Sequence, residues 1–273
     1  NVLRMDADGR RSSTPVNRGV RVEDCRFAFI RDNVIEPEGA ATDWRVTGNV
    51  MFNCHAAFSF DGVEVRNAVY AGNTILNWSA PGPTPRPGDE TEYYRGGKIW
   101  KLPKPGKAPG RVGLISAFNS VQTRTSIAKK GAFPGWVMAN CALGLWSGDH
   151  PDPPNGRREA FPDMDWTGIE TAGVVCDDPN PDDPPGFRIV DRVFERPTLV
   201  PEAEAWPWPD AHLTLTSAAA AVPSEAVDVP LPSGATFTAE AGHRVGVEGA
   251  WSTGLIDAIR NDPGEADPPA GTA

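Results

Sequence analysis

Residues 46–53 read Val46-Thr47-Gly48-Asn49-Val50-Met51-Phe52-Asn53, and near-copies of this segment recur along the chain. An earlier copy is Val22-Glu23-Asp24-Cys25-Arg26-Phe27, and a later one is Tyr70-Ala71-Gly72-Asn73-Thr74-Ile75. Two weaker copies are Ser116-Ala117-Phe118-Asn119-Ser120-Val121 and Val137-Met138-Ala139-Asn140-Cys141-Ala142. Repetition is therefore the main signal in this sequence.

The copies align if five residues are equivalent: Cys25, Asn49, Asn73, Asn119 and Asn140. The first two steps are then 24 residues each, and the long step to Asn119 is one such coil plus about 22 inserted residues. A period in the low twenties with short apolar strands is typical of a β-solenoid, because each coil covers the apolar face of the next.

Two columns of residues test this alignment. The column two places after the aligned residue is apolar throughout: Phe27, Met51, Ile75, Val121 and Ala142. The column three places before it has one polar exception: Val22, Val46, Tyr70, Ser116 and Val137. We expect both columns to stack in the interior. We also expect the repeated asparagine to adopt the left-handed backbone of a sharp corner and to hydrogen-bond to its neighbour one coil away.

On these repeats, from about residue 20 to 145, the chain resembles the right-handed parallel β-helix proteins of the pectate-lyase-like superfamily. The resemblance implies an all-β, right-handed parallel β-helix (a β-solenoid) with long loop insertions and a C-terminal cap. That superfamily includes lyases, glycoside hydrolases, esterases, phage tailspikes and non-catalytic adhesins, so the resemblance does not select one activity. We expect the chain to be the C-terminal portion of a longer protein, or a processed form.

The predicted organisation has five parts. Residues 1–19 end a preceding coil or loop, and residues 20–147 form coils with a basic, aromatic insertion at 81–110. Residues 148–186 are an acidic, proline-rich insertion. Residues 187–260 supply the last strands and a cap that covers the last coil, and residues 261–273 form a disordered tail.

The composition favours a turn-rich fold and argues against nucleic-acid binding and membrane-spanning proteins. The 273 residues include 28 Gly and 28 Pro, which favours many turns over long helices. A net charge of −10 argues against a general nucleic-acid partner, and no apolar run reaches the length of a membrane span. The four cysteines lack metal-type spacing, and either buried thiols or a disulfide would fit them.

The insertion at 81–110 carries six positive and three negative residues, and either a solvated excursion or a contact surface for an anionic sugar chain would explain it. A polysaccharide lyase needs a base and a cation beside a uronate carboxylate. The catalytic candidates are His55, Arg95, Lys98 and Lys101. The aromatic candidates for substrate contact are Tyr93, Tyr94 and Trp100. A structural role at a coil turn is the alternative for His55.

Carboxylates give further candidates. Glu36 and Glu38 fall on the same side of a strand and are expected to face outward, as is Asp61 beside a buried Phe58 and Phe60 pair. These carboxylates would contact substrate, hold a metal or supply the two acids of a glycoside hydrolase; a solvated face is the alternative. Asp163 and Asp165 alternate in a way that could hold Ca²⁺, although no complete calcium motif surrounds them.

The sequence thus predicts a secreted or cell-surface protein that binds, and in one reading cleaves, an acidic polysaccharide. The alternative is a non-catalytic structural or adhesive β-helix that binds carbohydrate. Nothing in the residues indicates an oligomeric state.

Overall fold

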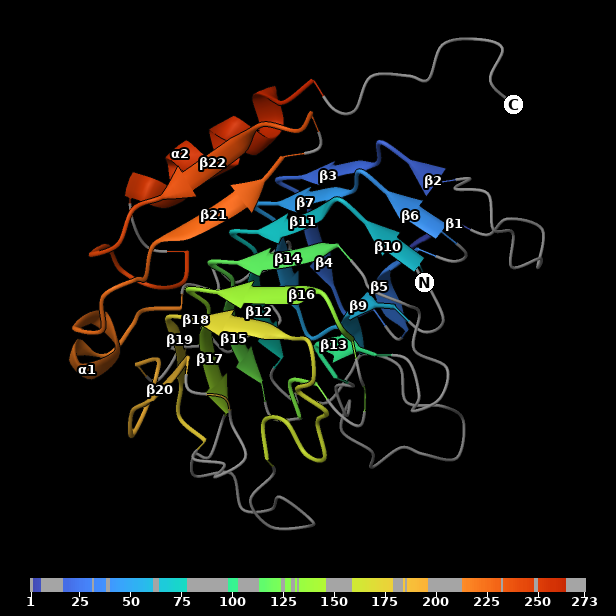
Figure 1. Ribbon diagram of the computed structural model, residues 1–273. Coiled ribbons are helices and arrows are strands. Elements are labelled where there is room, and N and C mark those ends of the chain that lie inside the picture. The colour runs from blue at the N-terminus through green and yellow to red at the C-terminus, as the bar shows by residue number, and fades with distance from the viewer. Residues whose placement is uncertain are drawn as a thin grey trace, which may run out of the picture.

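A computed structural model describes residues 2–5, 17–30, 32–37, 40–60, 64–77, 98–102, 113–123, 126–128, 131, 133–145, 159–178, 184, 186–195, 213–231, 233–247 and 250–263. The described part is predominantly β-structure, with many short strands in parallel sheets and two helices (Figure 1). This agrees with the all-β prediction.

Four sheets are parallel. The four-stranded sheet contains β1 (Leu3–Met5), β5 (Asn33–Pro37), β9 (Ala56–Ser59) and β13 (Trp100–Lys101). The three-stranded sheet contains β2 (Asn17–Arg18), β6 (Ala40–Thr42) and β10 (Glu64–Arg66). The six-stranded sheet contains β3 (Arg21–Glu23), β7 (Arg45–Thr47), β11 (Ala68–Ala71), β14 (Leu114–Ala117), β16 (Trp136–Ala139) and β18 (Glu170–Ala172). The seven-stranded sheet contains β4 (Arg26–Ala28), β8 (Val50–Phe52), β12 (Thr74–Asn77), β15 (Ser120–Thr123), β17 (Ala142–Leu145), β19 (Val174–Cys176) and β20 (Phe187–Ile189).

Neighbouring strands in each sheet come from successive repeats of the sequence. The six-stranded sheet has the order β3-β7-β11-β14-β16-β18, and the seven-stranded sheet follows the same progression from β4 to β20. Each repeat therefore passes through the sheets in turn, and its strands pair with those of the repeats before and after it. This arrangement is compatible with a β-solenoid.

The register confirms most of the predicted alignment. Met51 pairs with Phe27 on one side and Ile75 on the other, and Ile75 pairs with Val121. The next step was predicted one residue too early, because Val121 pairs with Leu143 and not with Ala142. In the other column, Ser116 likewise pairs with Met138 and not with Val137. Cys141, not Asn140, is thus the residue equivalent to Asn119.

Hydrogen bonds join the aligned asparagines across the repeats, as predicted. Asn49 Nδ2 donates to Asn73 Oδ1 at 2.9 Å, and Asn73 Nδ2 donates to Asn119 Oδ1 at the same distance. The same oxygens also accept from the backbone N–H groups of Asn49 and Asn73. Cys25 and Cys141 flank this asparagine ladder, since Cys25 N–H donates to Asn49 Oδ1 and Asn119 Nδ2 approaches Cys141 Sγ.

The left-handed corner residue is the one before each asparagine, so that part of the prediction was wrong. Gly48 and Gly72 have φ values of +66° and +65°, and the equivalent Asp24, Phe118 and Asn140 also have positive φ. The asparagine side chain instead spans the corner, where it can reach both adjacent repeats. The weak fifth copy misled the alignment because Asn140 occupies the left-handed position, which asparagine tolerates.

Aromatic residues fill the interior between the sheets. Phe58 lies 4.9 Å from Tyr70 and 5.8 Å from Trp100, measured between ring centroids, and Trp100 lies 5.7 Å from Trp136. All four side chains are buried. Ser116, the polar exception in its column, accepts a hydrogen bond from Trp136 Nε1 at 2.9 Å, which explains why it is tolerated there.

The C-terminal elements run back along the outside of the sheets (Figure 1). We call β21 (Val227–Pro230), β22 (Thr236–Ala239), α2 (Ala250–Asn261) and Asp262 the C-terminal strap. The strap packs on the outer face of the six-stranded sheet. The preceding segment, with Phe194, Leu213, Leu215 and α1 (Ser217–Ala220), packs on the outer face of the seven-stranded sheet. The described parts of the C-terminal segment thus cover two sheet faces along the stack. A cap over the last coil stays a prediction, and α2 was not foreseen.

Several predicted boundaries move. Lys98 to Leu102, within the predicted 81–110 insertion, contribute β13 to the stack, and β18 and β19 lie within the predicted 148–186 insertion. β1 and β2, in the predicted 1–19 segment, pair with β5 and β6. α2 extends through Asn261 and Asp262 is buried, so the stack's contacts continue past the predicted start of the tail. Residues 264–273 lie outside the described residues.

None of the four cysteines forms a disulfide. Cys54, Cys141 and Cys176 are buried, whereas Cys25 is exposed. Burial raises the pKa of the Cys54 and Cys141 thiols to about 12, so they stay protonated and unreactive at neutral pH. The buried-thiol interpretation holds for these three residues.

The asparagine ladder can be tested with two asparagines that are equally buried. Asn73→Ala removes the side-chain hydrogen bonds of Asn73 and leaves the Asn49 N–H without an acceptor. We therefore expect a loss of about 3 kcal/mol in the free energy of unfolding. Asn53 makes no side-chain hydrogen bond and has a φ of +47°, so Asn53→Gly should cost under about 1 kcal/mol. Urea unfolding curves measure both values, and equal losses would contradict the ladder's importance.

The contact between α2 and the turn at Gly72 can be tested by comparing two glycines that have positive φ, Gly72 and Gly19. Alanine strains the backbone at both Gly72 and Gly19. At Gly72 the added Cβ would also lie 2.6 Å from Ile256 Cδ1, whereas nothing lies within 4 Å at Gly19. Gly72→Ala should therefore destabilise by about 1–2 kcal/mol more than Gly19→Ala in thermal or urea unfolding. Equal effects would mean that α2 does not press on this corner.

Candidate functional site

Three polar residues form a row across the four-stranded sheet. Ile35 pairs with Phe58 and Ser59 pairs with Lys101, which places Glu36, Ser59 and Lys101 side by side on consecutive strands. The Ser59 hydroxyl donates to Glu36 Oε1 at 3.3 Å. Side chains alternate along a strand, and Phe58 and Trp100 point into the interior, so this row lies on the outer face.

Glu36 was expected to face outward, either as a substrate or metal contact or as part of a solvated face, and the solvated alternative was wrong. It is buried, with 8% of its surface exposed, and Ser59 is fully buried. A carboxylate can be held in such a place because the Ser59 hydroxyl replaces one of its water contacts. Lys101, at the end of the row, is half-buried. The row therefore has a buried acidic end and a more accessible cationic end.

Two further predicted residues lie at the other end of the same strands. His55 directly precedes β9, and its backbone N–H donates to Ile30 O at 2.8 Å. Lys98 lies two residues before β13, whose pairing with β9 brings Lys98 to the level of the start of that strand. Both side chains are half-buried. One sheet therefore carries Glu36, His55, Lys98 and Lys101 from three separate segments of the chain.

Trp100 is part of the core and not of a sugar-binding surface. Its side chain is fully buried between the rings of Phe58 and Trp136. β13 alternates, so the strand that turns Lys101 outward must turn Trp100 inward. The prediction of a substrate contact for Trp100 was therefore wrong.

Five other predicted residues lie outside the described residues: Glu38, Asp61, Tyr93, Tyr94 and Arg95. Their assignments stay predictions.

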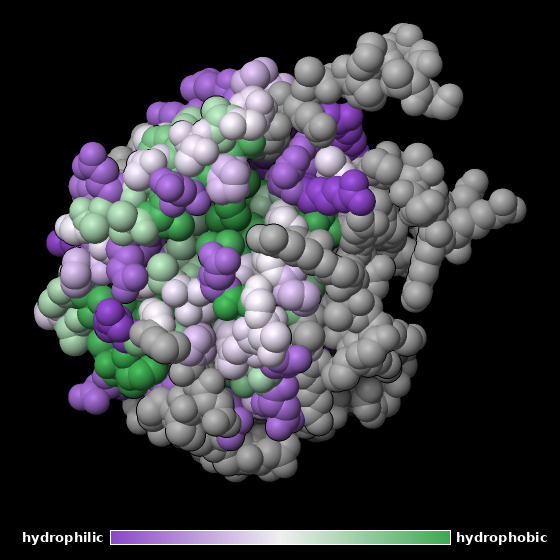
Figure 2. All heavy atoms as spheres, in the orientation of Figure 1, coloured by the Kyte–Doolittle hydropathy of each residue, from purple (hydrophilic) through white to green (hydrophobic). Residues whose placement is uncertain are grey.

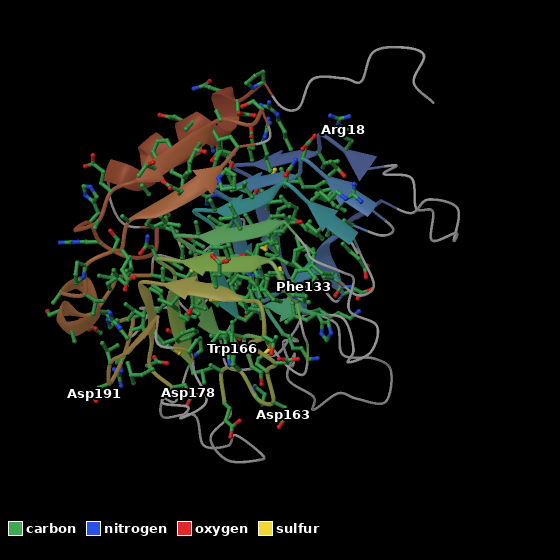
Figure 3. The ribbon with its side chains drawn as sticks, viewed as in Figure 1. Arg18, Phe133, Asp163, Trp166, Asp178 and Asp191 are labelled. Carbon is green, nitrogen blue, oxygen red and sulfur yellow. The ribbon has the colours of Figure 1, made fainter. Side chains whose placement is uncertain are left out.

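The predicted calcium residues lie outside the strands of the four-stranded sheet. Asp163 and Asp165 are exposed, and Figure 3 shows Asp163 at the lower end of the molecule. Asp165 Oδ1 accepts from the Thr167 N–H at 3.0 Å, and hydrogen bonds from Thr167 lower the pKa of this carboxyl. In the part of the chain that the structure describes, no group of three or more His, Cys, Asp or Glu residues could hold a metal ion. The calcium assignment of Asp163 and Asp165 stays a prediction.

Sequence reasoning missed Ser59 as a member of the row and Asp177 as a titrating group. Ser59 follows Glu36 by 23 residues, close to the repeat length, and this spacing was the available signal. Asp177 joins two segments, since Oδ1 accepts from Leu145 N–H at 2.6 Å and Oδ2 from Val193 N–H at 3.3 Å. Desolvation by burial, with a smaller contribution from Asp178, raises the pKa of Asp177 to about 6.

The surface in Figure 2 mixes hydrophilic and hydrophobic residues. None of the helices among the described residues is both long enough and apolar enough to cross a membrane. Comparison of the chain with protein-family models, with curated proteins and with solved structures found no match.

Asp177 should make stability depend on pH. Its folded pKa of about 6 exceeds the ordinary value of 3.8, so between these values the folded state binds more protons than the unfolded state. The free energy of unfolding should therefore fall as pH rises from about 4 to 6, by roughly 2 kcal/mol. Asp177→Asn should remove this part of the slope in urea titrations at each pH. An unchanged slope would show that Asp177 is not the group responsible.

Proposed function

We propose that this chain is a right-handed parallel β-helix of the pectate-lyase-like type and that it binds an acidic polysaccharide across the outer face of the four-stranded sheet. The observation that carries the proposal is the Glu36, Ser59 and Lys101 row, with His55 and Lys98 just before β9 and β13. Segments far apart in the sequence supply these residues, so only the stacked fold brings them together.

The charge and the geometry of this face suit an anionic polymer. Adjacent strands lie about 4.8 Å apart, so a row that crosses strands offers contacts in series along the stacking direction. Lys98 and Lys101 are half-buried, and a lysine in such a position packs its stem on the sheet and holds its ammonium group toward the surface. A uronate carboxylate would pair with such a cation.

The same residues could support cleavage by β-elimination. A base, from Lys101, Lys98 or His55, would take the proton next to the uronate carboxylate. The C–H electron pair would form a C=C bond, the glycosidic C–O bond would break, and the leaving oxygen would take up a proton. A neighbouring cation would lower the pKa of the abstracted proton by stabilising the developing negative charge.

A binding protein without catalysis is the second candidate. The buried contact between Ser59 and Glu36 favours it, because a carboxylate already satisfied by its neighbour has a structural role. In this reading the stacked repeats present a long, rigid face for adhesion or for a structural contact. Both candidates place the ligand on the four-stranded sheet and differ only in whether a product forms.

We also propose that the protein acts outside the cell or at its surface, where acidic polysaccharides are found. The state of the cysteines is compatible with such a location. Cys54 and Cys141, but not the exposed Cys25, have buried thiols with raised pKa values, which protects them from oxidation.

Binding can be measured by calorimetry with pectate, alginate and a glycosaminoglycan. Lys101→Ala and Lys98→Ala should each weaken binding of the preferred polymer by about tenfold, and added salt should weaken it further. Arg192→Ala is the matched control, because it removes one positive charge from an exposed position near the other end of the stack. Equal weakening by all three variants would reduce the effect to net charge and refute the site.

Cleavage is read separately, from the ultraviolet absorbance of unsaturated products with and without EDTA. Product formation that is lost in Lys98→Ala but kept in His55→Ala would place the base near β13. The reverse result would assign the base to His55. Binding without product would favour the adhesive alternative, and neither binding nor product would refute both candidates.

A further inference from the structure

The C-terminal strap is attached to the six-stranded sheet by two kinds of contact. Leu255 and Ile259 of α2 are buried with Val69 and Ala71 of β11 in one apolar cluster. Beyond them, the end of α2 is attached through charged groups. Figure 2 shows hydrophilic residues gathered at this end of the stack, near β3.

Asp262 is the centre of the charged attachment. Its Oδ1 accepts from Arg45 Nη2 at 2.7 Å and from Ser233 N–H at 3.1 Å, and its Oδ2 accepts from the Ser233 hydroxyl. Its backbone carbonyl accepts from Arg45 Nη1 and Arg21 Nη2, both at 3.0 Å. Arg45 and Asp262 are 3% and 4% exposed, so this ion pair is shielded from solvent.

Two exposed contacts lie beside it. Arg21 Nη1 donates to the carbonyl oxygen of Arg260 at 2.7 Å, at the helix end where a cation is favourable. Arg260 Nη2 donates to Asp24 Oδ1 at 2.6 Å, and the Asp24 side chain is 67% exposed. An ion pair of this exposure contributes little and is screened by salt.

The attachment also buries polar atoms without satisfying them. Four side-chain atoms at the end of α2 and on the strands beneath it are buried and have no hydrogen-bond partner: Glu23 Oε1, Arg45 Nε, Thr47 Oγ1 and Arg260 Nε. Glu23 and Thr47 are paired in register on β3 and β7, and Arg45 lies two residues before Thr47 on β7. Arg260 binds Asp24, the residue after Glu23, so the four residues lie in one region. Burial and the nearby Arg21 lower the pKa of Arg45, which means that this environment disfavours its charge. A slight lift of the helix would let water reach all four atoms.

The packed state of α2 therefore has a specific geometry but only a small free-energy advantage over a state in which the helix has lifted. A buried ion pair recovers only part of the cost of removing its charges from water, and unsatisfied neighbours add to that cost. We propose that residues 250–262 form a latch that opens as a unit while the parallel sheets remain folded, with the contact between Arg45 and Asp262 as its catch. Opening uncovers the apolar outer face of β11 and the left-handed corner at Gly72, which Ile256 contacts.

Native-state hydrogen exchange on the full chain tests the latch. The amides of α2 should exchange through an opening with weak dependence on denaturant, well before those of β11 and β14. Asp262→Asn keeps the shape of the side chain and removes its charge, so it should speed exchange in α2 by about tenfold or more and leave the sheet amides unchanged. Asp257→Asn, at an exposed position of the same helix, is the matched control and should have no effect.

Two results would overturn the proposal. One is that α2 amides exchange only with the sheet amides in wild type, and the other is that Asp262→Asn accelerates all amides alike. Asp24→Asn provides a milder variant that keeps the buried pair, and it should speed α2 exchange only a few-fold. Failure of Asp262→Asn to fold, together with no change in α2 exchange in Asp24→Asn, would also refute a separable latch.

Discussion

Hydrogen bonding between successive repeats is the constraint on which this structure depends. A strand of three or four residues cannot be stable alone, so each one needs a partner on the repeat before it and the repeat after it. The asparagine ladder at the corner between the six- and seven-stranded sheets fixes that partnership. Each asparagine satisfies backbone groups that the turn would leave unpaired, and it does so on a neighbouring repeat. Register is thereby set at the corner and carried into both sheets.

Once the stack is formed, the outer faces of the sheets acquire different roles. The outer faces of the six- and seven-stranded sheets carry apolar residues, which the strap and the segment around Phe194 and α1 cover. The four-stranded sheet carries the polar row of Glu36, Ser59 and Lys101 on its outer face. The C-terminal segments thus add stability where apolar surface requires cover, and the proposed ligand face lies on a different side of the stack.

Charged groups are buried in pairs around Asp262 but are partly accessible on the four-stranded sheet. Around Asp262 the positive and negative groups are buried together and hold the strap in place, at a cost in desolvation. On the four-stranded sheet Lys98 and Lys101 remain partly accessible, within a chain whose net charge is −10. A buried pair gives positional specificity, whereas accessible cations offer attraction to an anionic ligand.

The sequence by itself determined the repeat length, the all-β class and most of the register, because stacked strands force like residues into columns of constant period. It also placed Met51 and Ile75 in the interior correctly. Only the tertiary structure showed that Cys141 is the equivalent of Asn119 in the next repeat, because a one-residue shift in a weak copy leaves the apolar pattern nearly unchanged. It likewise decided that Trp100 is core and that Glu36 is buried against Ser59. Those facts depend on which strands are neighbours in the sheet. The repeat length of the sequence does not show which side chains pack across a sheet or which segment covers its outer face.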